Sequence, residues 1–239
     1  MSYQTIFKRY EMKYMLTKEQ KEAVLLAMVP YMKIDKYGRT TIRNIYFDTD
    51  SYRLIRHSIE KPVYKEKLRI RSYKQTKAED TVFIELKKKY DSVVYKRRIA
   101  LPQAQVMDFI NKGEHLHQRS QISDEINYFC DYYGTLHPAV FLSYEREAYY
   151  SLDKSDFRVT FDDNILCRTE KLSLSEDIYG TPLLEEGQVL MEIKTSGAVP
   201  LWMAHCLAEN KIYKTSFSKY GTAYQKILHN NYKGEQIYA

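Results

Sequence analysis

Charged side chains recur at every second position in one segment of this chain after another. In an extended strand, residues two apart share a face, so this spacing places the charges on one side. Residues 64–73 show the pattern most clearly, with one face formed by Lys65, Lys67, Arg69 and Arg71. The opposite face of the same segment carries Leu68 and Ile70. The pattern predicts a sheet with one charged face and one packed face.

Eight segments alternate with period two and are predicted to be strands. They are Arg9–Met15, Thr41–Phe47, Tyr64–Tyr73, Thr81–Lys89, Ser92–Ala100, Val140–Tyr150, Phe157–Asp163 and Val189–Thr195. Segments with helical spacing lie between them: Thr17–Met28, Pro102–Asn111, Asp124–Tyr132, Pro200–Ala208 and Tyr220–Leu228. This order of elements favours an antiparallel α+β fold over a doubly wound sheet.

The charged faces of these strands have an unusual composition. An antiparallel sheet with one solvated face would explain any single strand, but such a face mixes small polar residues with both signs of charge. Here nearly every strand supplies Lys or Arg, and acids are few. The further charged faces are Glu85 with Lys87, Lys96 with Arg98, Arg158 with Asp162, Glu192 with Lys194, and Arg9 with Glu11 and Lys13. If the sheet curls into a barrel, these cations point inward and repel one another unless a polyanion and a metal neutralise them.

Composition sets the remaining limits. The chain has 239 residues and no internal repeat or linker, so residues 1–239 are predicted to form a single domain. Its net charge of +6 is low for a nucleic-acid binder, and the basic residues lie at alternate strand positions around acids instead of forming one exposed stripe. Three widely spaced cysteines, no apolar stretch in Met1 to Tyr10 and no long apolar window predict a cytoplasmic protein without a membrane span.

Short motifs in a fixed order connect this pattern with a known family. They are Glu11-Met12-Lys13-Tyr14, Leu68-Arg69-Ile70-Arg71, Ile84-Glu85-Leu86-Lys87, Lys96-Arg97-Arg98, Tyr144-Glu145-Arg146-Glu147, Arg158-Val159-Thr160-Phe161-Asp162, Met191-Glu192-Ile193-Lys194 and Phe217-Ser218-Lys219-Tyr220. Together they resemble the VTC domain of polyphosphate polymerases, within the CYTH or triphosphate tunnel metalloenzyme superfamily. The resemblance covers roughly residues 7 to 228, and it implies an eight-stranded antiparallel barrel, the triphosphate tunnel fold, flanked by helices.

The resemblance also implies a reaction and a site. The reaction transfers the terminal phosphate of ATP to a growing polyphosphate chain. The implied catalytic residues are Lys13, Arg69, Arg71, Lys87 and Arg146. The implied substrate contacts are Glu11, Lys96, Arg98, Arg158, Lys194 and Lys219. Glu192 is implied as the ligand of Mn²⁺ or Mg²⁺, since hard cations prefer carboxylate oxygen.

One departure bears on the type of reaction. Hydrolytic branches of the superfamily begin with Glu-x-Glu-x-Lys on one strand face, whereas this chain has Arg9, Glu11 and Lys13. A cation at the first position weakens metal binding there and favours a transferase, whose phosphate nucleophile needs no general base. Two other hypotheses remain: a triphosphate hydrolase or nucleotide cyclase of the same fold, and a polyphosphate-binding module without catalysis.

Overall fold

The computed structural model describes residues 10–91, 93–112, 115–117 and 120–228, and its centre is one large antiparallel sheet. The described strands are β1 (Tyr10–Leu16), β2 (Met32–Ile34), β3 (Thr40–Asp48), β4 (Tyr64–Ser72), β5 (Thr81–Tyr90), β6 (Val93–Pro102), β7 (His137–Ser151), β8 (Arg158–Arg168), β9 (Thr181–Pro182), β10 (Val189–Thr195) and β11 (Lys214–Thr215). Nine strands follow the order β11-β1-β10-β8-β7-β3-β4-β5-β6, while β2 pairs with β7 and β9 pairs with β8. The antiparallel α+β prediction is therefore confirmed.

The described helices are α1 (Lys18–Met28), α2 (Arg53–Ile59), α3 (Gln103–Lys112), α4 (Gln121–Tyr133), α5 (Leu201–Glu209) and α6 (Lys219–Ala223), which continues as a π-helical turn over Tyr224–Leu228. None of them, in the part of the chain that the structure describes, is long and apolar enough to cross a membrane. Each predicted strand and helix has a counterpart. The three additional strands are only two or three residues long, too short to show an alternating pattern.

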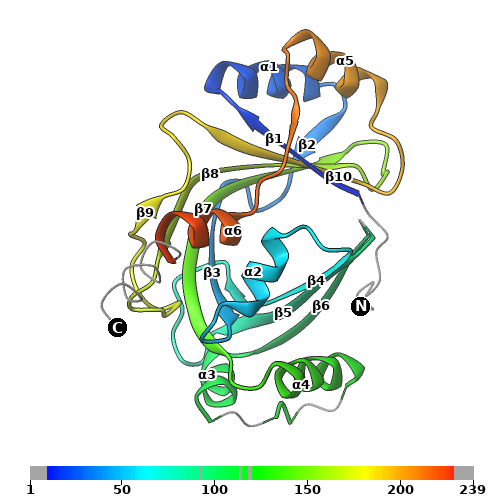
Figure 1. Cartoon of the computed structure of the whole chain (residues 1–239). Helices are drawn as coiled ribbons and strands as arrows, with labels where there is room; N and C mark the ends of the chain where they lie inside the picture. Colours follow the sequence, from blue (N-terminus) through cyan, green and yellow to red (C-terminus); the bar gives the residue numbers. More distant parts are fainter. Residues whose placement is uncertain (1–9, 92, 113–114, 118–119, 229–239) are drawn as a thin grey trace.

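Local irregularities bend the sheet into a deep curve (Figure 1). The register between β3 and β7 shifts at Tyr46/Phe47, and that between β7 and β8 shifts between Ser143 and Glu145. Asn164 in β8 adopts a left-handed conformation with φ 46°. Such bulges increase the twist of a strand and turn it toward one side. The curvature gives the sheet a concave face, called the inner face below, and a convex outer face.

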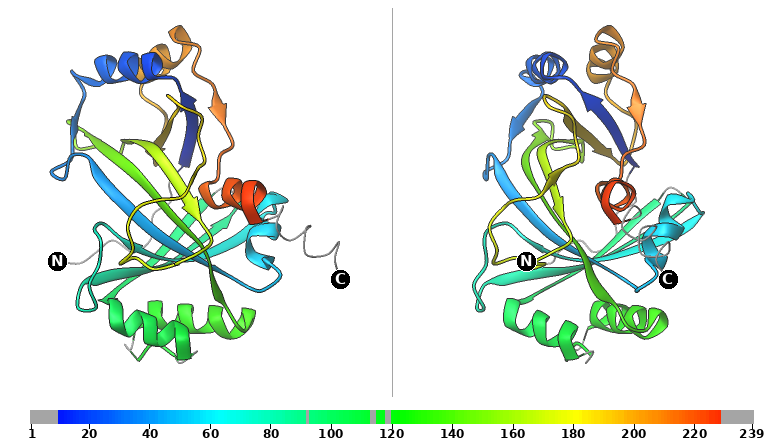
Figure 2. Two further views of the ribbon diagram at one scale, coloured as in Figure 1. Left: turned by 90° about the vertical axis from the view of Figure 1, so that its left-hand side faces the viewer. Right: turned by 60° about the vertical axis from the view of Figure 1, so that its left-hand side comes forward.

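Three hydrophobic clusters hold this curved sheet. On the outer face, α1 and α5 pack over β1, β8 and β10 through residues that include Val24, Val159 and Met203. At the opposite side of the molecule, α3 and α4 cover the outer face of β4 to β6 (Figures 1 and 2). The third cluster lies on the inner face, where α6 brings Tyr220 against Tyr46 with ring centroids 4.9 Å apart. The layers α1–α5 and α3–α4 therefore both lie on the side of the sheet that faces away from its charged residues.

The backbone ladder has β6 and β11 as its ends. Where eight barrel strands were predicted, the described residues form an eleven-stranded sheet that does not close through main-chain hydrogen bonds. Side chains span the gap between β1 and the pair β4–β5. The Lys87 ammonium donates to a Glu11 carboxylate oxygen at 2.8 Å. The segment after β11 adds two contacts: Lys13 donates to the Phe217 carbonyl at 2.6 Å, and Lys67 donates to the Ser218 hydroxyl at 3.0 Å. Polar contacts thus complete the enclosure at this edge.

Candidate functional site

Charged side chains from seven strands and one helix converge on the inner face of the sheet. Ten of the described residues there are basic: Lys13, Lys67, Arg69, Arg71, Lys87, Lys96, Arg98, Arg146, Lys194 and Lys219. Four are acidic: Glu11, Glu85, Asp162 and Glu192. We call this set the inner site. Cations outnumber carboxylates within it, so it presents an excess of positive charge to any ligand.

Glu85 on β5 organises one half of the inner site. Its carboxylate is fully buried and contacts a nitrogen of Arg69 at 2.7 Å, of Lys96 at 2.6 Å and of Arg98 at 2.6 Å. The strand register explains the contacts with the two arginines, because Glu85 lies directly opposite Arg69 on β4 and Arg98 on β6. Burial alone would raise the pKa of Glu85, but Arg69 and the other cations hold that pKa well below its usual range.

Asp162 and Glu192 organise the other half. The buried Asp162 carboxylate accepts two hydrogen bonds of 2.6 Å from Arg146 and one of 2.5 Å from Lys219. Glu192 contacts Lys194 at 2.9 Å and lies 3.6 Å from Lys13. It also lies 3.7 Å from Arg146 and 3.8 Å from Lys219. Although burial raises both pKa values, these cations outweigh it and lower the pKa of Asp162 and of Glu192.

Lys67 differs from the other basic residues of the inner site. It forms no ion pair with a carboxylate of the described chain, and its ammonium donates to Ser218. Burial, followed by the charge of Lys13 and Lys87, lowers the pKa of Lys67 to about 7. Burial likewise lowers the pKa of Lys96 to about 7, although Glu85 acts against it. Near neutral pH, an added anion would stabilise the charged form of both lysines.

Uncharged residues complete the site, and the sequence did not single them out. Arg71 donates to the Asn44 side-chain oxygen at 2.9 Å and to the Tyr144 hydroxyl at 3.1 Å. Arg69 donates to the Tyr46 hydroxyl at 2.8 Å. Burial would raise the pKa of Tyr144, but Arg71 and other cations lower it to about 8. Asn44 and Tyr46 stand two apart on β3, a spacing that could have revealed them as members of the same face.

The structure brings eleven of the twelve residues implied by the family resemblance into the inner site. The twelfth, Arg158, lies at the start of β8, where its side chain is exposed. It stands opposite Lys194 on β10 and Tyr150 on β7, so it lies at the edge of the charged surface. Arg9 lies outside the described residues. The structure adds Lys67 to the inner site. The sequence pattern had placed it on the same strand face as Arg69, but the family resemblance did not imply a role for it.

The donor groups of the inner site fit a divalent metal ion only when phosphate oxygens supply further ligands. Among the described residues, no three His, Cys, Asp or Glu side chains come together as a ready-made metal cage. Glu192 and its neighbour Asp162 provide hard carboxylate oxygens, but four cations lie within 4 Å of Glu192. A metal ion would reach Glu192 most favourably together with phosphate oxygens, which supply further ligands and offset the cations. The residues therefore fit a divalent metal ion that is bound as a complex with phosphate.

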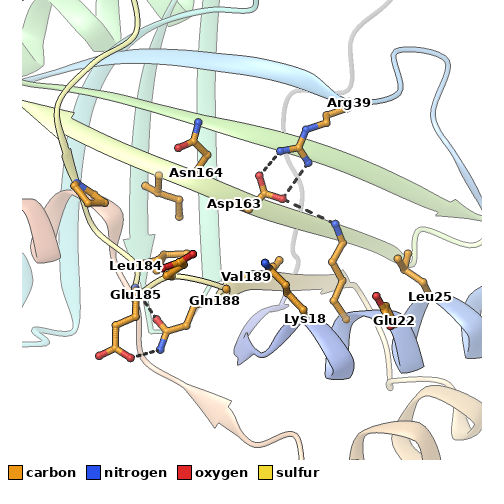
Figure 3. A pocket seen from close by; sticks show the side chains of 15 residues that line it. Lys18, Glu22, Leu25, Arg39, Asp163, Asn164, Leu184, Glu185, Gln188 and Val189 are labelled. Atoms are coloured by element: carbon orange, nitrogen blue, oxygen red, sulfur yellow. Dashed lines mark hydrogen bonds and ion pairs between the residues drawn. The ribbon is translucent and has the colours of Figure 1, made fainter.

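A separate pocket of about 640 Å³ lies on the outer face, between α1 and the turn that precedes β10. Figure 3 shows Arg39 and Asp163 joined by hydrogen bonds at its wall, with a lysine of α1 also reaching Asp163. That lysine, Lys21, also donates to Glu147 at 2.6 Å. Because these cations are matched by carboxylates, this pocket lacks the excess positive charge of the inner site.

Comparisons with known proteins agree with this fold. The family model described as VTC domain matches residues 8–228. No curated protein sequence gave a match. Among solved structures, a candidate adenylate cyclase from Bacillus halodurans superposes with a TM-score of 0.56 at 15% identity, covering 90% of this chain and 96% of that one. A candidate adenylyl cyclase from Hippeastrum, whose dominant activity is that of a triphosphatase, gives a TM-score of 0.54 at 16% identity, covering 90% and 93%. At these identities the two structures show a shared fold.

Proposed function

Because the chain belongs to the VTC-domain family, we propose that it is a polyphosphate polymerase, which transfers the terminal phosphate of ATP to a polyphosphate chain. The observation that carries the proposal is the composition of the inner site. Among the described residues, four carboxylates pair with nine of its ten basic side chains, which leaves an excess of positive charge. Such a site suits a ligand that is a linear polyanion of phosphates.

The reaction places modest demands on the protein. The bond between the γ-phosphorus of ATP and its bridging oxygen breaks, ADP leaves, and a terminal oxygen of polyphosphate forms the new P–O–P bond. Catalysis of phosphoryl transfer depends mainly on positioning and on stabilising charge at the phosphoryl oxygens. Arg69, Arg71 and Arg146 offer planar, oriented donors, while Lys13 and Lys219 add point charges. A contact with Glu85 orients Arg69, and contacts with Asp162 orient Arg146 and Lys219, before substrate arrives.

The state of the carboxylates supports transfer over hydrolysis. A hydrolase gains from a general base whose pKa lies near the working pH, so that it can accept a proton from water. All four carboxylates of the inner site instead have a lowered pKa, and that of Glu11 falls to about 2. Burial opposes this shift in the pKa of Glu11, but the charges of Lys87 and Lys194 together outweigh it. An already ionised phosphate oxygen needs no such base.

The metal ion would bind to the Glu192 carboxylate, with Asp162 beside it. A bound Mn²⁺ or Mg²⁺ would neutralise charge on the phosphate oxygens as the transferred group moves. Glu192 would hold that ion, while Lys194 and Lys13 would keep the carboxylate in place. Arg146 lies between the two carboxylates and would bind the same phosphate from the side of β7.

Incubation with ATP and Mn²⁺, or with Mg²⁺, tests the proposal directly. We expect ADP and long polyphosphate, resolved on a gel, with faster growth when a short polyphosphate primer is added. Glu192→Gln should abolish metal-dependent turnover and still bind polyphosphate, and Glu66→Gln on the outer face serves as a matched control. Free phosphate without chain growth would indicate the triphosphatase alternative. Binding without turnover would indicate a polyphosphate-binding module.

A further inference from the structure

The inner faces of β4, β5 and β6 form successive rows of paired residues. In the first row, Arg69, Glu85 and Arg98 lie side by side, and the carboxylate balances its neighbours. In the next row, Lys67 faces Lys87, which faces Lys96. In the row after that, Lys65 faces Lys89. Like charges directly opposite each other destabilise a sheet, so these two rows carry an energetic penalty in the free protein.

The outer faces of β4, β5 and β6 show that the fold itself does not require unpaired lysines. Lys88 lies on the outer face between Lys87 and Lys89 in sequence, and it contacts Glu125 at 3.4 Å and Glu66 at 3.9 Å. Arg97 on the same side contacts Glu125 at 3.1 Å. Outer-face cations of these strands thus have carboxylates within reach. Among the described residues, the two lysine rows have only two such ion pairs, Lys87 with Glu11 and Lys96 with Glu85.

Lys65 and Lys89 have no ion pair with a carboxylate in the described part of the chain. The Lys65 ammonium donates to the Ser58 carbonyl at 3.1 Å, and burial together with Lys89 and Lys61 lowers the pKa of Lys65. These side chains are partly exposed and stand near the end of the β4–β5 pair, which finishes at Tyr64 and Tyr90. A ligand that leaves the arginine row along β4 would therefore meet Lys67 first and Lys65 next.

We infer that Lys65, Lys67, Lys87 and Lys89, here called the lysine ladder, form a subsite for the part of a phosphate chain that extends beyond the reacting triphosphate. The inference rests on the proposed function and adds a direction to it: the polymer leaves the inner site along β4 and β5. Residues two apart on a strand are separated by about 6.5–7 Å, so Lys65 lies about 13–14 Å along the strand from Arg69. A triphosphate, with two bridging oxygens, is too short to occupy both positions.

Binding measurements with two phosphate chains test the ladder. The parent protein, Lys65→Met, Lys89→Met and the double variant would be titrated with inorganic triphosphate and with long polyphosphate at one fixed salt concentration. We expect the double variant to lose roughly tenfold or more in affinity for long polyphosphate, since two charged contacts are removed. Its affinity for triphosphate should stay within about twofold of the parent. Lys88→Met, on the outer face of the same strand, is the matched control and should leave both affinities unchanged.

The other outcomes are equally informative. Equal losses for both chains would place Lys65 and Lys89 within the triphosphate site and overturn the ladder. Unchanged affinity for both chains would also overturn it, and would leave the proposed function intact if the parent still elongates polyphosphate. A parent protein that binds neither chain would overturn the proposed function and the ladder together. Circular dichroism and melting of each variant would verify that the fold is retained.

Discussion

Both sides of the curved sheet carry ion pairs, but the surroundings of these charges differ between the outer and the inner face. On the outer face, Lys21 pairs with Glu147 and Arg39 pairs with Asp163, in contacts that water can reach. On the inner face, the carboxylates of Glu85 and Asp162 are completely buried, and each is shared by several cations. The ion pairs of the outer face resemble those of an ordinary solvated surface, whereas the described inner face is an ionic network in which cations outnumber carboxylates.

This difference explains how the inner face can stay folded without its ligand and still bind an anion. A buried carboxylate surrounded by cations stabilises their positions, and the cations that remain in excess set the affinity. On the outer face, screening by water and salt makes each pair nearly independent of its neighbours. Removing charges from each face should therefore have different consequences for stability and for binding.

The largest effect is expected for Glu85→Gln. This change leaves Arg69, Lys96 and Arg98 without their shared carboxylate, so the free energy of unfolding should fall by about 3–5 kcal/mol. Added polyphosphate should restore a large part of the loss, because it binds only the folded state. Chemical denaturation with and without the ligand measures both effects. The control is Glu125→Gln on the outer face, expected to cost about 0–1 kcal/mol. Equal losses for the two variants would contradict the distinction between the faces.

Substitution of Lys67 in the inner site is expected to have a smaller effect on stability, and in the opposite direction. Since Lys67 has no carboxylate partner in the part of the chain that the structure describes, Lys67→Met should leave the free protein as stable as the parent or more stable. Its affinity for polyphosphate should fall roughly tenfold. Arg69→Met provides the contrast, because it removes a contact with Glu85 and should lower both stability and affinity. Thermal melts of the two variants, with and without polyphosphate, provide the comparison. A marked loss of stability in ligand-free Lys67→Met would show that Lys67 is a structural residue.

The same lysine predicts opposite responses of stability and binding to pH. Burial lowers the pKa of Lys67 from 10.5 to about 7, so between these values the unfolded state binds a proton that the folded state lacks. The stability of the free protein should therefore rise with pH from about 7 to 9, and Tyr144, with its pKa lowered to about 8, acts in the same direction. Affinity for polyphosphate should fall over this range, because Lys67 and Lys96 lose their charges. Lys67→Met should reduce both slopes, which denaturation and titration at several pH values would detect.

The sequence predicted most of the fold because the strand pattern is strong. Leu68 and Ile70 alternate with basic residues on β4, and a slip by one position would bury the charges against α3 and α4. The short helix α2 had no such signal. It begins after Tyr52, in a left-handed conformation with φ 55°, and it is held by the buried Asp48 carboxylate, which accepts from the amides of Leu54 and Ile55. That arrangement depends on tertiary contacts.

The candidate site was predictable in its residue types but not in its pairings. Lys87 and Glu11 meet across the gap between β5 and β1, a contact that only the curvature of the sheet creates. Glu85 could have been assigned to any nearby lysine, and the register of β6 was needed to give it Arg98. Tyr144 was overlooked because a tyrosine in a strand usually indicates packing. Its position among cations became apparent only from the structure.

The smallest effect is expected for the pair Arg39 and Asp163 on the outer face, which Figure 3 shows at the wall of the outer pocket. The Arg39 side chain is 47% exposed, so water and salt screen the attraction. In a double-mutant cycle with Arg39→Met and Asp163→Asn, we expect a coupling of about 0.2–1 kcal/mol at low salt that fades at high salt. Polyphosphate affinity should not change in any of the three variants. Because Asp163 also lies 4.0 Å from Lys21, its own substitution should cost slightly more than that of Arg39. A coupling comparable to the loss in Glu85→Gln, or a loss of polyphosphate binding, would show that the outer pocket shares the electrostatics of the inner site and would remove the contrast between the two faces.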